Sequence, residues 1–260
     1  MRSPRLYVFV AIILSLGFLV FVKSLPFEAL SQDDANNLVV ANKTKAFQIT
    51  EANLVDDGFT LSLKNNDGRR ITAFAITVGK EFRITEDFII SEVSDEVGIQ
   101  PQETFKHTYP LSLSQRLLKI TLQAVVFDDK TGDGDPVIFE DIRDARLGQA
   151  VQFKRTLKLL EKYEDSLNGE HGGDTSKLKQ NIEAALNGPE RETLTLLRDL
   201  HPLGTINRKG KDSLSDFVRE GLAAGKADVL RRMKEVEDSA NSRDSLLKMT
   251  AYYRKLLERI

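Results

Sequence analysis

The chain has 260 residues, of which 41% are hydrophobic and 29% are charged, and these proportions are typical of a folded globular protein. The formal net charge is −2 and no long stretch is strongly basic, so the sequence shows no electrostatic signature of nucleic-acid binding. The absence of cysteine excludes disulfides, thiolate nucleophiles, cysteine-bound zinc and lipid attachment through an N-terminal cysteine.

The N-terminal residues 1–25 predict a secretory signal peptide or a signal anchor. Arg2 and Arg5 precede an apolar run over residues 6–22, and a polar stretch follows it. As a helix, this run would extend about 25 Å, which is at the short limit for spanning a bilayer and long for a signal-peptide core. The two arginines predict that the N-terminus is cytoplasmic.

Two outcomes remain open for this segment. If it is retained, residues 6–22 anchor the protein in the bacterial inner membrane and the body lies in the periplasm. If it is cleaved after Ser24, the protein is secreted. Either outcome places the remaining chain outside the cytoplasm, and residues 26–45 are expected to form a linker. A buried core helix is a third interpretation, which the position behind two arginines disfavours.

Residues 46–140 are predicted to form a β-domain. Residues 59–64 alternate apolar and polar side chains, which is typical of a half-buried strand. The Asp-Gly pair at residues 67–68 predicts a hairpin turn, with residues 69–78 as the return strand. Because both faces of that return strand are apolar, we expect it to be a central strand of a two-layer structure.

Two later segments are also expected to be strands. Residues 104–113 contain Pro110, which indicates an edge strand, and residues 118–127 alternate clearly. Short strands separated by Gly, Asn and Asp turns favour an antiparallel β-sandwich. No helical periodicity interrupts them, so a parallel α/β sheet is not expected.

Residues 59–76 and 124–135 together contain a strand, an Asn-rich turn, a second strand and a later acidic Gly loop. In this order they resemble a group of uncharacterised secreted or membrane-anchored bacterial proteins with an immunoglobulin-like β-sandwich. The resemblance implies an immunoglobulin-like fold for this part of the chain. It carries over no activity to this chain, because none is established for that group.

Residues 141–260 are predicted to form an all-helical domain, since apolar residues recur there every three or four positions. The expected fold class is therefore α+β. Gly221 and Gly225 lie four residues apart on one predicted helix, and this spacing is expected to allow close packing of a neighbouring helix.

The segment that follows the last predicted strand suggests a calcium loop. Calcium loops carry oxygen ligands at positions one, three, five, seven and twelve. Those positions here hold Asp129, Thr131, Asp133, Asp135 and Glu140. Gly134 at the sixth position provides the sharp turn, but Pro136 and the preceding strand argue against a true EF-hand. A solvated turn is the alternative interpretation, because Asp and Gly dominate turns.

The sequence contains no Gly-x-Ser-x-Gly, phosphate-binding, dinucleotide-binding or His-Glu-x-x-His motif. It therefore predicts a non-catalytic extracytoplasmic binding or scaffolding protein of the bacterial cell envelope. Its expected partners are the membrane, through residues 6–22 if they are retained, and a protein that the sequence does not identify. The alternative is an envelope hydrolase or calcium-dependent enzyme with a site assembled around residues 128–140.

Overall fold

The computed structural model describes residues 37–79, 82–89, 97–110, 117–167, 175–201 and 214–260. Within these ranges the chain forms five helices and two sheets, which confirms a fold of mixed helices and sheets. No helix in the described ranges is both long and apolar enough to cross a membrane. The predicted N-terminal segment lies outside them.

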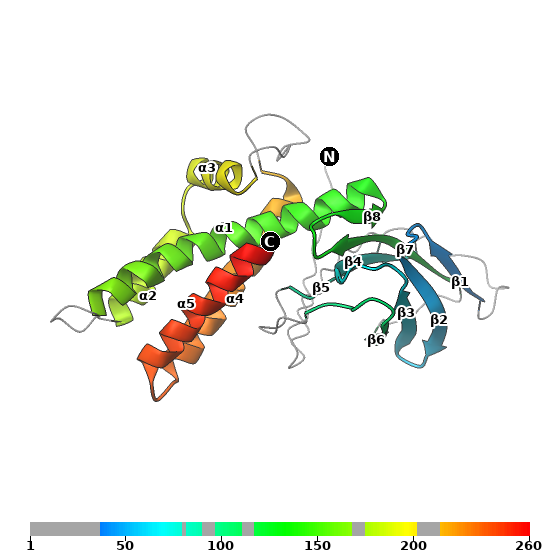
Figure 1. The fold of residues 1–260 in the computed structure, drawn as a ribbon, viewed down its shortest axis with the longest axis horizontal. Helices are drawn as coiled ribbons and strands as arrows, with labels where there is room; N and C mark the ends of the chain where they lie inside the picture. Colours follow the sequence, from blue (N-terminus) through cyan, green and yellow to red (C-terminus); the bar gives the residue numbers. More distant parts are fainter. Residues whose placement is uncertain (1–36, 80–81, 90–96, 111–116, 168–174, 202–213) are drawn as a thin grey trace, which may run out of the picture. The chain divides into compact units, whose positions relative to one another are not determined.

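The chain divides into two compact units, residues 1–140, called the β unit below, and residues 141–260, called the helical unit. The described strands of the β unit are β1 (Asn37–Asn42), β2 (Phe47–Val55), β3 (Gly58–Asn65), β4 (Ile71–Val78), β5 (Phe82–Asp87), β6 (Thr104–Pro110), β7 (Leu117–Phe127) and β8 (Gly132–Gly134) (Figure 1). The described helices are α1 (Pro136–Leu167), α2 (Thr175–Leu186), α3 (Glu190–Leu200), α4 (Asp216–Glu237) and α5 (Ser242–Arg259).

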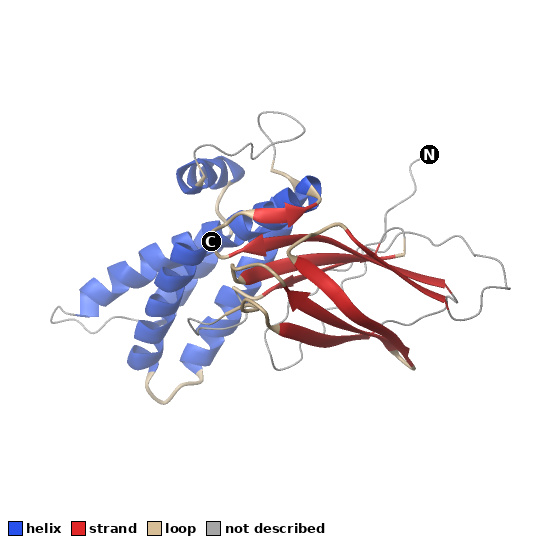
Figure 2. Ribbon diagram, turned by 45° about the vertical axis from the view of Figure 1, so that its right-hand side comes forward, coloured by secondary structure: helices blue, strands red, loops and turns tan. Residues whose placement is uncertain are grey.

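The strands of the β unit form two layers, which Figure 2 shows in red. One sheet has the order β1-β7-β4-β5, with β8 paired to the second half of β7, and the other has the order β2-β3-β6. Strand β6 is an edge strand, as Pro110 predicts. All pairs are antiparallel except β1 with β7, which run parallel.

Strand β1 corrects the expected linker over residues 26–45 and the expected all-antiparallel sandwich. It pairs with β7 from Asn37 to Asn42, and its Leu38 packs against the hydrophobic core. The apolar residues of β1 are consecutive rather than alternating, so period alone does not indicate a strand there. The strand depends on its pairing with β7, a segment distant in the sequence.

Side chains from both sheets share one hydrophobic core. Phe47 on β2 meets Phe74 on β4 edge to face, with ring centroids 5.3 Å apart. Phe105 on β6 packs against the same Phe74 ring at 5.6 Å. Phe47 and Phe74 are fully buried, and burial of each such side chain stabilises the fold by about 1.5–3 kcal/mol. The two sheets therefore pack face to face.

The Asp-Gly pair at residues 67–68 does not close a hairpin, so that prediction is wrong. Strand β3, before it, lies in one sheet, and β4, after it, lies in the other. The fully buried side chain of Asn65 fixes this crossing, since its Nδ2 donates to the carbonyl oxygens of Arg69 (2.8 Å) and Ile99 (3.0 Å). Its Oδ1 accepts a hydrogen bond from the backbone nitrogen of Asp67 (3.0 Å). Strand β4 is nevertheless central, between β7 and β5, as predicted.

Helices α1 and α4 of the helical unit approach each other through glycines. A Cβ added at Gly221 would lie 1.9 Å from the carbonyl oxygen of Ala145, and one at Gly148 would lie 2.2 Å from that of Val218. A Cβ at Gly225 would lie 3.0 Å from the backbone of α1. The prediction that the two α4 glycines allow close helix packing is therefore confirmed.

Candidate functional site

The acidic loop, residues 128–135, joins β7 to α1 and contains the short strand β8. Gly134 has a φ of +104°, and a Cβ there would lie 2.3 Å from the carbonyl oxygen of Gln123 on β7. Only glycine suits both the backbone conformation and this close approach. The structure therefore requires glycine at this position, where strand β8 ends, whereas the sharp turn of a calcium loop stays a prediction.

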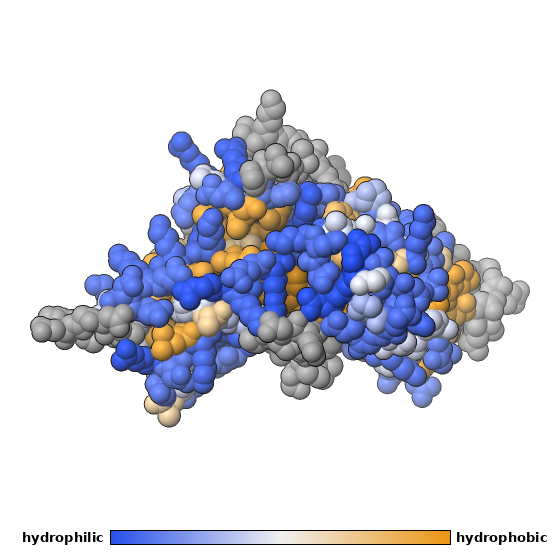
Figure 3. Space-filling model, viewed as in Figure 1, coloured by the Kyte–Doolittle hydropathy of each residue, from blue (hydrophilic) through white to orange (hydrophobic). Residues whose placement is uncertain are grey.

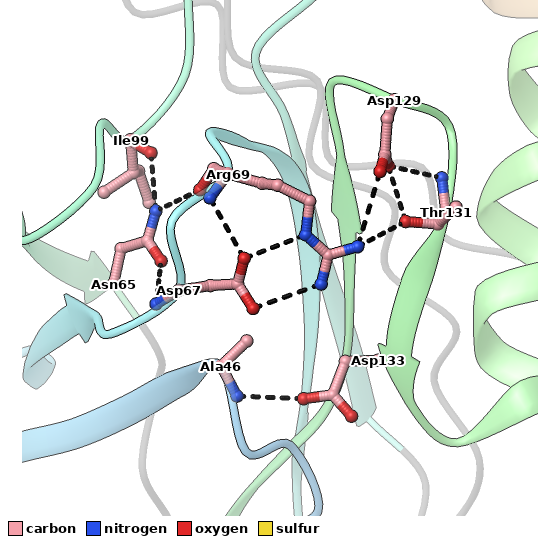
Figure 4. A network of polar contacts seen from close by, with 8 residues as sticks. All are labelled: Ala46, Asn65, Asp67, Arg69, Ile99, Asp129, Thr131 and Asp133. Carbon is pink, nitrogen blue, oxygen red and sulfur yellow. Dashed lines mark hydrogen bonds and ion pairs between the residues drawn. The ribbon is translucent and has the colours of Figure 1, made fainter.

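Asp133, on β8, binds the turn that connects β1 to β2 (Figure 4). Its Oδ2 accepts hydrogen bonds from the backbone nitrogens of Lys45 (2.6 Å) and Ala46 (2.9 Å). Hydrogen bonds from backbone amides to an ionised carboxylate are stronger than bonds between neutral groups. Asp133 therefore holds two segments of the β unit together that are far apart in the sequence.

Asp129 belongs to a second group of polar contacts, which is centred on Arg69 (Figure 4). The Arg69 guanidinium donates to both carboxylate oxygens of Asp67, at 2.8 and 3.1 Å, and to Thr131 Oγ1 at 2.8 Å. It also lies 3.4 Å from Asp129 Oδ2 and 3.8 Å from the centre of the Phe127 ring. Hydrogen bonds from Thr131, with a smaller effect of Arg69, lower the pKa of Asp129 below its ordinary value.

Of the last two predicted ligands, Asp135 directly precedes α1 and Glu140 lies within it. Asp135 pairs with Lys43 (Nζ–Oδ2, 3.0 Å), and its Oδ1 accepts a hydrogen bond from the backbone nitrogen of Val137 (3.0 Å). The hydrogen bond from Lys43 is the main cause that lowers the pKa of Asp135. Glu140 is half-buried within the first turns of α1.

These contacts distribute the predicted ligands among different protein partners. Asp133 binds backbone amides, whereas Asp129 and Asp135 pair with Arg69 and Lys43. In the described ranges, no three His, Asp or Glu residues are grouped so that they could hold a metal ion. A calcium ion would have to displace these cationic partners, so calcium binding stays a prediction. The lowered pKa values also keep Asp129 and Asp135 ionised at neutral pH, which does not suit a general acid.

A second titratable cluster, which the sequence did not single out, lies between the two sheets. Glu86 on β5 is only 1% exposed, and neither carboxylate oxygen has a hydrogen-bond partner among the described residues. Burial raises the pKa of Glu86 to about 7. The Tyr109 hydroxyl partly offsets this rise, although its contact with the carboxyl lacks ordinary hydrogen-bond geometry.

The Tyr109 side chain, which interacts with this carboxyl, belongs to a group of packed aromatic rings. Tyr109 is buried and stacks on Phe59 with ring centroids 5.1 Å apart, and the His107 ring meets it at 4.6 Å. Burial lowers the pKa of His107 and raises that of Tyr109 well above its ordinary value. One signal in the sequence could have indicated the cluster. Glu86 lies two positions after Ile84, so the alternation of side chains along β5 places both on the core-facing side of the strand.

A scan against protein-family models finds no match to this chain, and searches of curated proteins and of solved structures find none either.

Proposed function

We propose that this protein is a non-catalytic binding module of the bacterial cell envelope that uses strand β1 to bind an extended segment of another envelope protein. The composition and the exposure of β1 support this proposal. The strand is the outermost of its sheet, and its Val39 and Val40 side chains are 44% and 41% exposed. Figure 3 shows hydrophobic side chains at the end of the β unit where β1 lies in Figure 1.

An edge strand of this kind is suited to pairing with a further strand. Soluble proteins commonly protect sheet edges with charged residues, prolines or bulges. Strand β1, with the sequence Asn-Leu-Val-Val-Ala-Asn, contains neither a charge nor a proline. A partner strand would form main-chain hydrogen bonds along the edge, and its apolar side chains would cover the two valines.

The location is part of the same proposal. The apolar run over residues 6–22 would insert into the inner membrane and leave the described residues of both units on the periplasmic side. If the run is retained, the 14 residues 23–36 that separate it from β1 limit the distance of β1 from the membrane surface to at most about 50 Å. The resemblance to immunoglobulin-like envelope proteins agrees with this location, and we infer such a sandwich from two sheets that share one core.

Site-specific photo-crosslinking in living cells tests the binding proposal. A photoreactive residue at position 39 or 40 should give a discrete cross-link to one envelope protein. The substitution Val40→Lys, made with the photoreactive residue kept at position 39, should abolish that product. Leu247, which is 40% exposed in the helical unit, is the matched control position.

Cross-linking at positions 39 and 40 that is no stronger than at position 247 would contradict the proposal, as would a product made only of two copies of this chain. The location has its own test. A reporter that is active only in the cytoplasm should be inactive when fused after Ile260. The mass of the mature protein then distinguishes a retained anchor from cleavage after Ser24.

A further inference from the structure

The two sheets of the β unit enclose an ionisable group that plays no part in the acidic loop or in the exposed β1 strand. Glu86 is 1% exposed, and no described residue forms a hydrogen bond with either of its carboxylate oxygens. An ionised carboxylate is costly in such surroundings unless it is paired, so the neutral form is favoured. The fold therefore depends on the protonation state of this side chain.

The groups that face this carboxyl come from strands in both sheets. From β6, the buried Tyr109 hydroxyl interacts with it, and His107 packs against the Tyr109 ring. From β4, its pairing partner is Phe74, and that strand contains no titratable residue. On its own strand, the neighbouring Asp87 carboxylate repels the ionised form. None of these groups supplies the positive charge that would stabilise an ionised Glu86.

The position of Glu86 decides which part of the β unit would respond to its ionisation. Strand β5 is the outermost strand of one sheet, and β6 is the outermost strand of the other. The two strands lie on the same side of the β unit, because Phe88, directly after β5, meets Phe105 on β6 with ring centroids 5.5 Å apart. Edge strands have one paired neighbour instead of two, so they open at a lower free-energy cost than central strands.

We propose that Glu86 is a proton-controlled latch between β5 and β6: the protonated carboxyl keeps this edge of the β unit closed, and its ionisation opens the edge to water. A neutral carboxyl remains buried beside the Tyr109 hydroxyl, whereas a carboxylate gains its missing hydrogen bonds only when water enters between the strands. The pKa near 7 places this transition close to neutral pH. The latch does not depend on what binds to β1.

Amide hydrogen exchange of the full-length protein at pH 5.5 and pH 8.5, corrected for the intrinsic pH dependence of exchange, tests the latch. Peptides that cover β5 and β6 should exchange faster at pH 8.5, by a factor on the order of ten to a few hundred. Peptides that cover the β2–β3 hairpin should change much less. In Glu86→Gln, whose side chain has a similar shape and cannot ionise, protection of β5 and β6 should be the same at both pH values.

Asp56→Asn is the matched control, since it removes an exposed carboxyl from the turn between β2 and β3 and should leave the wild-type response intact. Equal protection of the wild type at both pH values would overturn the proposal, and so would the same loss of protection in Glu86→Gln. If Glu86→Gln does not fold, a carbon-13 titration of the Glu86 carboxyl in the wild type decides instead. A midpoint near pH 7 supports the latch, and one near the ordinary value of 4.5 overturns it.

Discussion

Asp133 Oδ2 lies 2.9 Å from the backbone nitrogen of Ala46, although 87 positions separate the two residues in the sequence. The same oxygen accepts a hydrogen bond from the nitrogen of Lys45. An acidic residue that the sequence pattern predicts as a cation ligand thus connects β8 to the turn before β2. This contact gives the acidic loop a structural role that can be measured.

The first prediction concerns that contact. Asp133→Ala should destabilise the β unit by about 1–2 kcal/mol, because two backbone amides lose a charged acceptor and one of them is partly buried. Denaturant unfolding measures the change. Asp57→Ala, in the exposed turn between β2 and β3, is the control and should stay within about 0.5 kcal/mol of the wild type. Equal stabilities of the two variants would show that the Asp133 contact contributes nothing.

The second prediction concerns the crossing between the sheets. Asn65→Asp should destabilise the β unit by about 2–4 kcal/mol, since a carboxylate cannot donate to the carbonyl oxygens of Arg69 and Ile99 and would repel them. The adjacent Asn66→Asp makes the same chemical change at an exposed position and should be nearly neutral. Comparison of the two unfolding midpoints checks this. A mild effect of Asn65→Asp would mean that the turn forms without this side chain.

The third prediction concerns the packing of α1 against α4. Gly221→Ala should destabilise the helical unit by about 2–3 kcal/mol, despite the better helix propensity of alanine, because the new Cβ would collide with the carbonyl oxygen of Ala145. Thermal unfolding followed by circular dichroism measures the loss. Gly68→Ala is the control, because nothing lies within 4 Å of a Cβ at that position. An unchanged or raised melting temperature for Gly221→Ala would contradict the close approach.

The fourth prediction is a pH dependence of stability that comes from Glu86. Its pKa is about 7 in the folded protein and 4.5 ordinarily, so the folded state binds the proton more tightly. Below pH 4.5, Glu86 is protonated in both the folded and the unfolded state. As the pH rises from about 4.5 to about 7, the free energy of unfolding of the wild type falls by up to about 3 kcal/mol, because the unfolded state releases the proton first. The difference in unfolding free energy between Glu86→Gln and the wild type should therefore grow over this pH range. A constant difference from pH 4 to pH 8 would refute the assignment.

The fifth prediction is the calcium affinity of the acidic loop. Because Lys43 and Arg69 compete for Asp135 and Asp129, we expect calcium to bind only weakly, with a Kd near 1 mM as an order of magnitude. Calorimetric titration measures it, and Asp129→Ala should weaken it further. If calcium produces neither heat nor a change in melting temperature, the loop is a structural turn alone.

Local patterns in the sequence correctly indicated many individual elements of this protein. The alternation in residues 59–64 predicted a strand, Pro110 predicted an edge strand, and the spacing of Gly221 and Gly225 predicted close helix packing. Each of these features depends on side chains a few positions apart or on the backbone chemistry of a single residue, so the sequence records it directly.

Only the tertiary structure decided which strands pair and what the polar side chains bind. At residues 67–68 the chain passes from one sheet to the other instead of forming a hairpin, because the buried Asn65 binds the carbonyl oxygen of Ile99. No local sequence pattern indicates this contact. Asp133 binds amides of a distant turn, and Glu86 lies between two sheets that the sequence does not show facing each other. Hydrogen bonding and burial depend on groups that folding brings together, whereas periodicity depends only on neighbours along the chain.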